Sequence, residues 1–287
     1  RLHACSAIAA LAKTEENRDI LMKANGLVAK LSSLLVTLKT EAEMEAPEDE
    51  TPEDTKRRLT QQKVTVSTRL NVCATLLHLS KQCSVSAAIC ADEQMIKDIA
   101  TLSADLSDQV HSRCLETLCH LTRLPSNTDA LAVSPETALA LHKCAASENS
   151  VDRVWALRAL QNITAHASEK SSFVTKEMLE VLCVSAEKLS APVEHEAAIA
   201  VIGNLCTDLA STMLIVNTHN VVNILVNVAN NIDYSPEIQF VACDALATIA
   251  MWIQRVAQAG SVPQGCAFEP LPTFKSAGYM RYHKNEF

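Results

Sequence analysis

The chain has 287 residues, of which 48% are hydrophobic, 20% charged and only 3% aromatic, and its formal net charge is −8 near neutral pH. Residues 41–54 contain eight acidic side chains and no basic ones, so the remainder of the chain is close to neutral. The protein therefore lacks the overall positive field that nonspecific nucleic-acid binding requires, and we expect no nucleic-acid partner.

A helical motif recurs along the whole chain. Each copy contains a branched apolar residue, called the reference residue here; the six are Ile8, Leu76, Leu118, Leu160, Ile202 and Leu246. Slim residues stand four and one positions before it, and a larger apolar residue stands three positions after it. Such spacings form one stripe of an α-helix, and slim residues let helices approach closely. The steps between reference residues are 68, 42, 42, 42 and 44, which is typical of stacked-repeat proteins.

Two shorter apolar segments lie between successive copies. Their expected ranges are 16–22 and 27–35, 84–90 and 93–103, 127–132 and 135–146, 169–174 and 176–188, and 211–216 and 220–230. Ser134 and Ser235 each place a capping hydroxyl before a first-turn proline, which is a helix start signal. No strand-like alternation persists. We therefore predict an all-α fold whose units each contain a short, a medium and a long helix.

The long first step is explained by an insertion at roughly residues 40–62. Its first part, residues 40–54, is rich in Glu and Asp and contains two prolines. Such a segment buries too little apolar surface to offset the entropy lost on ordering, so we expect a mobile, disordered acidic insertion. Without it the period is nearly restored.

Three helices in about 42 residues, the third ending in a small-Leu-x-Asn-Leu pattern, resemble the armadillo repeat. Residues 4–35 are especially similar to that family, through Glu16-Asn17-Arg18 and Asn25-Gly26. The resemblance spans residues 1–257, about six repeats with the first partial, and HEAT repeats are the neighbouring family. It implies a right-handed α-solenoid, a superhelix whose third helices line a concave groove. In the family that groove binds extended peptides or partner domains, often through a ladder of asparagines.

The ladder position lies two residues after each reference residue. Only Asn162 and Asn204 carry the asparagine there, whose amide both donates and accepts hydrogen bonds. Importin-α-like receptors have a tryptophan four residues before each such asparagine, whereas this chain has Arg158 and Ala200. This departure argues against a nuclear-import receptor.

The same helical face carries mostly basic and polar residues. The predicted groove residues are Lys13, His78, Lys81, Arg113, His120, Arg123, Trp155, Arg158, Asn162 and Asn204, with Glu116, Asp208 and Trp252 on the same face. A basic groove with a tryptophan suits an acidic, extended peptide. The alternative is that these are solvated helix positions, with Trp155 partly in the core.

The acidic insertion suggests a second hypothesis, in which it contacts the basic groove of its own chain and competes with a partner. The simpler alternative is a solvated loop.

Residues 258–287 break the repeat pattern. Prolines and glycines end the helical character, and half of the ten aromatic residues fall here, including Phe268, Phe274, Tyr279 and Tyr282. Because terminal repeats need their apolar edge covered, we expect this tail to pack on the last helices. The alternative is a linear segment that binds a partner.

The eleven cysteines do not suggest a disulfide framework, since their number is odd and no Cys-x-x-Cys occurs. Free, buried thiols favour a reducing compartment, the cytoplasm or nucleus. No apolar run reaches transmembrane length, and no membrane insertion is expected. The chain begins without Met and inside a repeat, so we expect a trimmed piece of a longer protein.

No motif for catalysis, cofactor binding or metal binding is recognisable. His111, Cys114, Cys119 and His120 do not share one helical face or a zinc spacing, and His195-Glu196 lacks the second histidine of a zinc protease. With five glycines, the chain has no phosphate-binding loop. We therefore predict a protein without a cofactor that is not an enzyme: an interaction scaffold whose groove holds a protein or peptide. The alternative is a structural or assembly subunit held through its aromatic tail.

Overall fold

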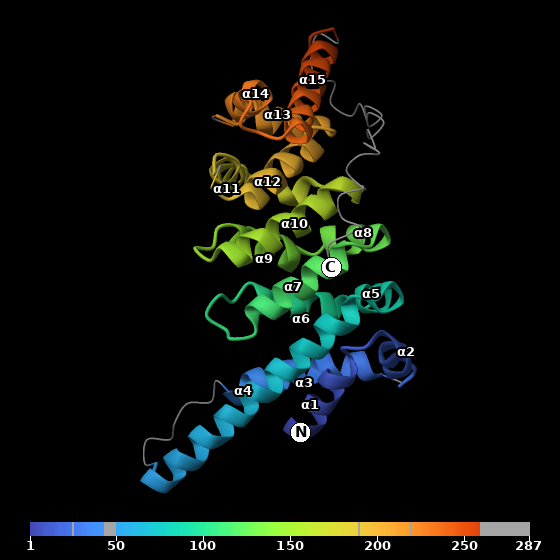
Figure 1. Cartoon of the computed structure of the whole chain (residues 1–287), viewed down its shortest axis with the longest axis vertical. Coiled ribbons are helices and arrows are strands. Elements are labelled where there is room, and N and C mark those ends of the chain that lie inside the picture. The colour runs from blue at the N-terminus through green and yellow to red at the C-terminus, as the bar shows by residue number, and fades with distance from the viewer. Residues whose placement is uncertain (25, 43–49, 189, 219, 259–287) are drawn as a thin grey trace. The chain divides into compact units, whose positions relative to one another are not determined.

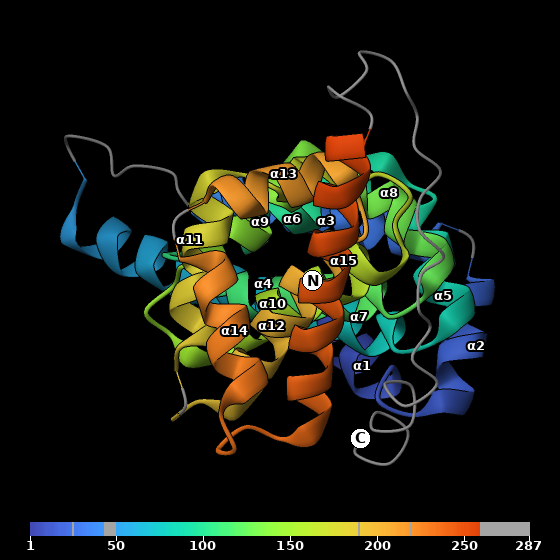
Figure 2. The same ribbon diagram turned by 90° about the horizontal axis from the view of Figure 1, so that it is seen from above.

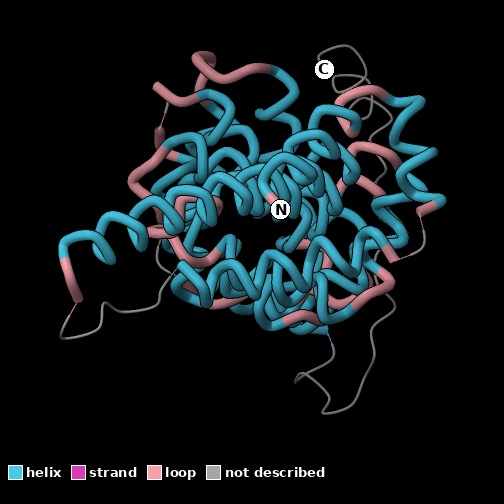
Figure 3. Tube along the Cα trace, turned by 90° about the horizontal axis from the view of Figure 1, so that it is seen from below, coloured by secondary structure: helices cyan, strands magenta, loops and turns pink. Residues whose placement is uncertain are grey.

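The computed structural model describes residues 1–24, 26–42, 50–188, 190–218 and 220–258. Across these residues the secondary structure consists of fifteen α-helices and two short 3-10 helices, and no strand occurs there (Figure 3). The prediction of an all-α fold is confirmed. The chain divides into two compact units, Arg1–Phe173 and Val174–Phe287.

Unit 1 contains four third helices, with other helices between successive ones (Figure 1). The third helices are α1 (Leu2–Leu11), α4 (Pro52–Ser80), α7 (His111–Thr122) and α10 (Ser150–His166). The shorter helices are α2 (Glu15–Lys23), α3 (Leu27–Ala42), α5 (Cys83–Cys90), α6 (Glu93–Ser103), η1 (Pro125–Asn127), α8 (Thr128–Ala132), α9 (Pro135–Ala145) and η2 (Ser171–Phe173). Successive third helices pack against each other in chain order.

Unit 2 repeats this plan with two third helices. They are α12 (Pro192–Leu205) and α15 (Pro236–Gln258), and the others are α11 (Lys176–Ala186), α13 (Leu209–Asn217) and α14 (Val221–Asn230). Helices α12, α13 and α14 all pack against α15, and α13 and α14 lie beside it in Figure 2. The short helix expected at 169–174 is reduced to the single 3-10 turn at Ser171–Phe173.

The predicted capping signals form helix ends. The Ser134 hydroxyl accepts a hydrogen bond from the Thr137 backbone N–H at 3.2 Å, and Ser235 accepts one from Ile238 at 3.4 Å. Each hydroxyl satisfies one of the backbone donors that a helix leaves unpaired in its first turn. These caps fix where α9 and α15 begin.

The repeated stripe forms the core of both units. Leu118, Leu160 and Ile202 are fully buried, as are the slim residues four positions before two of them, Ala156 and Ala198. Burying one such large side chain contributes about 1.5–3 kcal/mol relative to leaving it exposed. The residues that recur with the repeat period are therefore residues of the core.

Helix α1 is the exception to this pattern. Ala4, Ala7 and Leu11 are exposed, whereas the equivalent residues of later third helices are buried. These three side chains occupy the side of α1 that would face a preceding third helix, and no described helix precedes α1.

Much of the predicted insertion is helical. Residues 40–42 end α3, residues 52–62 belong to α4, and residues 43–49 lie outside the described residues. The expectation of disorder is therefore wrong for 52–62. Thr51 caps α4 by accepting a hydrogen bond from Asp54 N–H, Pro52 occupies the first turn, and the Glu50 carboxylate binds Arg58 at 2.8 Å. These are strong helix start signals, and they outweigh the polar composition.

Helix α15 differs from the other third helices in its overall apolarity. By length and composition it could cross a membrane, and the bent pairs α2–α3 and α13–α14 also pass that test when each is taken as one span. This corrects the expectation that no apolar segment reaches transmembrane length. Only part of α15 is covered, by α12, α13 and α14.

Candidate functional site

The third helices of unit 1 bring the predicted basic residues together on one side. We define the basic surface as Lys13, Arg18, His78, Lys81, Arg113, His120, Arg123, Trp155 and Arg158. These residues come from α2, α4, α7 and α10 and from the turns that follow α1, α4 and α7. Lys13, Lys81, Arg113 and Arg123 are exposed to solvent.

The exposed cations of the basic surface are not neutralised by ion pairs within the described part of the chain. Among the described residues, no carboxylate forms an ion pair with Lys13, Lys81, Arg113 or Arg123. Several cations elsewhere do have carboxylate partners; examples are Arg1 with Glu41, Lys39 with Asp105, Lys97 with Glu136 and Lys188 with Glu194. The basic surface therefore carries a net positive charge, in which Glu116 of α7, 3.8 Å from His120, is the acidic residue that the sequence also predicted for this face.

The pKa of His78 reflects this positive charge. Partial burial lowers the pKa of its imidazole, and so do Lys81, Arg18, Lys13 and Arg113. These cations come from three successive repeats, and each is close enough to disfavour a further positive charge at His78. Cations from the turn after α1 through α7 therefore act together at His78.

The second part of the basic surface is organised around Trp155. Its ring centroid lies 6.0 Å from that of His120, and the Arg158 guanidinium lies over the ring at 5.8 Å. Arg123 Nη1 lies 3.3 Å from His120 Nδ1. A guanidinium over the face of an indole is a favourable cation–π arrangement, which holds both side chains in place.

His120 is the buried member of the cluster around Trp155. Only 8% of the residue is exposed, so it contributes little surface of its own, in contrast to its predicted place in the groove. Burial, with Lys81 and Arg123, lowers the pKa of His120 to about 4. The imidazole is therefore neutral near pH 7 and adds no charge beneath Trp155.

Asn162, the best match to the asparagine ladder, is half-buried on α10. Its side-chain N–H donates a hydrogen bond of 3.0 Å to the Thr122 hydroxyl, which in turn donates to the Cys119 carbonyl. The amide thus links α10 to α7. A contact with a partner would have to use its carbonyl oxygen or its second N–H.

Other predicted residues lie elsewhere. Asn204 belongs to α12 of unit 2, and Asp208 caps α13 through the Ser211 N–H. Trp252 is 1% exposed and donates to the Cys206 carbonyl at 3.2 Å, so it is a core residue. The predicted tail contacts Phe268, Phe274, Tyr279 and Tyr282 lie outside the described residues.

Two residues that build or support the basic surface were not among the predicted groove residues. Arg18 donates to the Ala12 and Lys13 carbonyls, both at 2.8 Å, which brings its charge from α2 to the basic surface. Its place in Glu16-Asn17-Arg18 was the available sequence signal. Asn127 of η1 binds the Leu121 carbonyl at 3.0 Å and fixes the turn after α7, and nothing in its spacing indicated this role.

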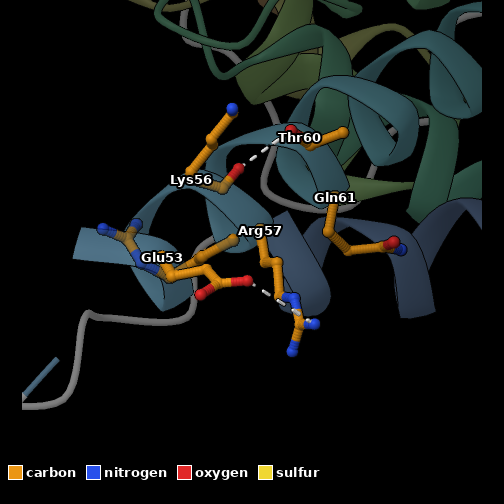
Figure 4. Close-up of a pocket in the computed structure, with 6 residues that line it drawn as sticks. Glu53, Lys56, Arg57, Thr60 and Gln61 are labelled. Atoms are coloured by element: carbon orange, nitrogen blue, oxygen red, sulfur yellow. Dashed lines mark hydrogen bonds and ion pairs between the residues drawn. The ribbon is translucent and has the colours of Figure 1, made fainter. Parts of the chain in front are cut away.

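A shallow depression lies on the N-terminal part of α4 (Figure 4). Glu53, Lys56, Arg57, Arg58, Thr60 and Gln61 line it. All six side chains come from this one helix, and two of them, Arg57 and Glu53, form only a long ion pair of 4.0 Å. A ligand site normally needs walls from several elements, so the basic surface is the better candidate.

The histidines and cysteines of α7 have structural partners. His111 binds Asp152, and the Cys114 and Cys73 sulfurs lie 3.7 Å apart. No cluster of three or more metal-ligating side chains occurs among the described residues. The ten described cysteines are free thiols, and eight of them are buried.

No protein-family model matches the sequence, and no curated protein matches it. Solved structures do match it. An engineered protein aligns with a TM-score of 0.65 at 18% identity, covering 88% of this chain and 90% of that one. The designed armadillo repeat protein YIII(Dq)4CqI aligns with a TM-score of 0.64 at 15% identity, covering 86% and 92%. A designed armadillo repeat protein in complex with the peptide (KR)4 aligns with a TM-score of 0.54 at 16% identity, covering 86% and 91%.

These similarities establish the fold. The predicted class, an all-α solenoid of armadillo-like three-helix repeats, is confirmed.

Proposed function

We propose that this protein is a non-enzymatic interaction scaffold and that the basic surface of unit 1 binds an acidic, extended peptide of a partner protein. The exposed positive charge of Lys13, Lys81, Arg113 and Arg123 is the observation that carries the proposal. Like charges gathered on one face cost folding energy unless a ligand of opposite charge binds there.

The architecture supports a peptide as the ligand. A designed armadillo neighbour is in complex with a peptide, so a protein of this fold can bind a peptide. That peptide, (KR)4, is basic, whereas the surface described here is basic itself. Electrostatic complementarity therefore favours the opposite charge for the partner of this protein.

Trp155 would provide the apolar anchor of such a site. It is half-buried, and the guanidinium of Arg158 lies over its ring at 5.8 Å, so its side chain is already ordered before binding. Pre-ordered aromatic and arginine side chains are the residues that most often dominate peptide affinity. A hydrophobic residue between acidic ones in the partner would fit this arrangement.

Charge reversal tests the proposal. The triple variant Lys81→Glu, Arg113→Glu and Arg123→Glu is compared with Lys30→Glu, Lys56→Glu and Lys143→Glu, which changes the net charge equally at exposed positions outside the basic surface. The probe is a fluorescent twelve-residue peptide of alternating Asp/Glu and Leu/Phe, measured by anisotropy at low and moderate salt. We expect the first variant to lose at least about tenfold in affinity and the second to bind like the unmodified protein. Equal losses in both variants would sink the proposal.

Competition between the acidic insertion and the partner peptide remains a prediction, since residues 43–49 lie outside the described residues. If it competes with the partner, deleting residues 43–49 while keeping the Thr51 cap should tighten peptide binding, and more so at low salt. Unchanged affinity at both salt concentrations would favour a solvated loop.

Location and membrane contact also remain proposals. Eight buried free thiols support a reducing compartment, cytoplasm or nucleus. We still expect that α15 does not insert into a membrane, because part of its surface packs on α12, α13 and α14. The alternative function, an assembly subunit held by its aromatic tail, depends on residues 259–287 and is addressed by the experiment below.

A further inference from the structure

The last third helix, α15, leaves exposed the positions that earlier third helices bury. These positions lie three residues before, one residue after and four residues after the reference residue. We call them the forward positions, because they face the next third helix. In α15 they are Cys243, Ala247 and Ala250, and all three are exposed.

The same positions are covered elsewhere within each unit. They are buried in α1 (Cys5, Ala9, Ala12), in α4 (Cys73, Leu77, Ser80) and in α7 (Leu115, Cys119, Thr122). In α12, Ile199 and Cys206 are fully buried and Gly203 is half-buried. Exposure of all three forward positions is therefore specific to α15 among these helices.

Contacts show what normally covers the forward positions. Cys73 of α4 lies 3.7 Å from Cys114 of α7, sulfur to sulfur, and Thr122 of α7 accepts a hydrogen bond from Asn162 of α10. A Cβ placed on Gly203 of α12 would lie 3.1 Å from Val241 of α15. In each case the following third helix provides the cover.

The uncovered side of α15 is largely apolar, with the partly exposed Asp244 at its margin. Phe240 and Met251 continue the line of Cys243, Ala247 and Ala250 along the helix, and they are 59% and 42% exposed. Helix α15 is apolar enough to resemble a membrane span because one side packs on its own unit while the other side is apolar and exposed. An acidic peptide would gain nothing here, so the surface is distinct from the basic surface.

We propose that the chain's own C-terminal segment, residues 259–287, covers the forward positions of α15. The segment follows α15 directly and contains five of the ten aromatic residues, four of which are Phe268, Phe274, Tyr279 and Tyr282. Its 29 residues could extend over more than about 80 Å, whereas the 23 residues of α15 span about 35 Å, so the segment can return along the whole helix.

The chemistry of the two surfaces is complementary. Slim residues at Cys243, Ala247 and Ala250 leave space for large rings, and burying each ring would remove apolar area from water. Pro263, Pro270 and Pro272 make a regular helix unfavourable there, so this occupant would bind as an extended chain and not as a further repeat helix. The proposal does not depend on the function of the basic surface.

Thiol reactivity tests this cover. Cys243 and Cys83 are the two exposed cysteines among the described residues, and Cys83 lies in unit 1 on α5, which makes it an internal control. Alkylation by iodoacetamide is followed at each site by peptide mass spectrometry in the full chain and in a chain ending at Gln258. We expect Cys243 to react at least about tenfold more slowly in the full chain, with Cys83 unchanged.

A second variant tests whether the aromatic residues, and not another part of the tail, slow the alkylation of Cys243. The full-length chain with Phe268→Ser, Phe274→Ser, Tyr279→Ser and Tyr282→Ser should regain the fast alkylation of Cys243. Equal rates at Cys243 in the full and shortened chains would overturn the proposal. Protection that rises with protein concentration would also overturn it, because it would identify a second copy as the cover. Protection only after addition of phosphatidylcholine vesicles would do so too, in favour of a membrane.

Discussion

His111 at the start of α7 binds Asp152 at the start of α10 across two successive repeats. The distance from His111 Nε2 to Asp152 Oδ2 is 2.9 Å, and Ser112 donates a second hydrogen bond of 2.9 Å to the other oxygen of the same carboxylate. Asp152 is 2% exposed, so these contacts replace most of its hydration. The pair therefore holds the N-terminal ends of α7 and α10 in a fixed register.

Removing the histidine should destabilise unit 1. His111→Ala leaves the buried Asp152 carboxylate without its main partner, which typically costs about 3 kcal/mol. Urea unfolding followed by circular dichroism measures the change. His142→Ala on α9, a half-buried histidine for which no ion pair occurs among the described residues, is the matched control and should change stability by less than about 0.5 kcal/mol. Similar losses in the two variants would show that the His111–Asp152 contact contributes little.

The same pair predicts a pH dependence of stability. Burial lowers the pKa of His111, but the hydrogen bonds with Asp152 and the Asp108 carbonyl outweigh it, so the pKa lies above the ordinary 6.5. Since the folded state prefers the protonated imidazole, the contribution is complete below pH 6.5 and is lost as the pH rises through the folded pKa. Unfolding free energies between pH 5.5 and 8 should therefore fall more steeply for the unmodified protein than for His111→Gln. Parallel pH profiles would contradict this assignment.

Gly203 allows α12 and α15 to approach closely. A Cβ at this position would lie 3.1 Å from Val241 Cγ1, which is tighter than ordinary packing but is met by a side chain that can shift. We expect Gly203→Ala to be close to neutral, because the gain in helix propensity of about 1 kcal/mol offsets the strain. Gly203→Leu should destabilise by about 1–3 kcal/mol through overpacking. Thermal unfolding of both variants distinguishes these effects, and a harmless leucine would mean that α12 and α15 are not held at this spacing.

The repeat period predicts most of the fold because core positions recur with it. Expected and observed bounds agree closely at α6 and α9, where amphipathic stripes and a capping serine mark the helix. The beginning of α4 could not be placed by composition, because its stability comes from the Thr51 cap and the Glu50–Arg58 contact. The local start signal was present in the sequence, but the acidic run concealed it.

The candidate site was less predictable than the fold. Helical spacing predicts Lys81, Arg113 and Arg123 on one side, and all three are exposed. It does not reveal that His120 is buried beneath Trp155, since burial there depends on a side chain from the next repeat. Trp252 shares the helical face of Trp155 in the sequence, yet it packs into the core of unit 2. The position of a residue on the helical face therefore predicts the direction of its side chain better than it predicts whether that side chain is exposed.

The Trp155 cluster predicts how peptide affinity divides among its members. Trp155→Ala removes the anchor and the surface on which Arg158 rests, so we expect a loss of about 2 kcal/mol in binding free energy to the acidic probe peptide. Arg158→Lys keeps the charge but loses the planar contact and should cost less, about 0.5–1 kcal/mol. Anisotropy titrations measure both. Identical losses for the two variants would indicate that charge alone, and not the stacked arrangement, determines affinity.

His78 provides a final test that senses the ligand directly. Burial and the cations Lys81, Arg18, Lys13 and Arg113 hold its pKa below the ordinary value of 6.5. An acidic peptide bound among these cations would neutralise their field, so the pKa of His78 should rise on binding and the complex should take up a proton. Affinity would then increase as the pH falls through the range between the free and bound pKa values. NMR titration of the His78 imidazole with and without the probe peptide measures both values. A His78 pKa unchanged by saturating peptide would place the binding site away from the basic surface.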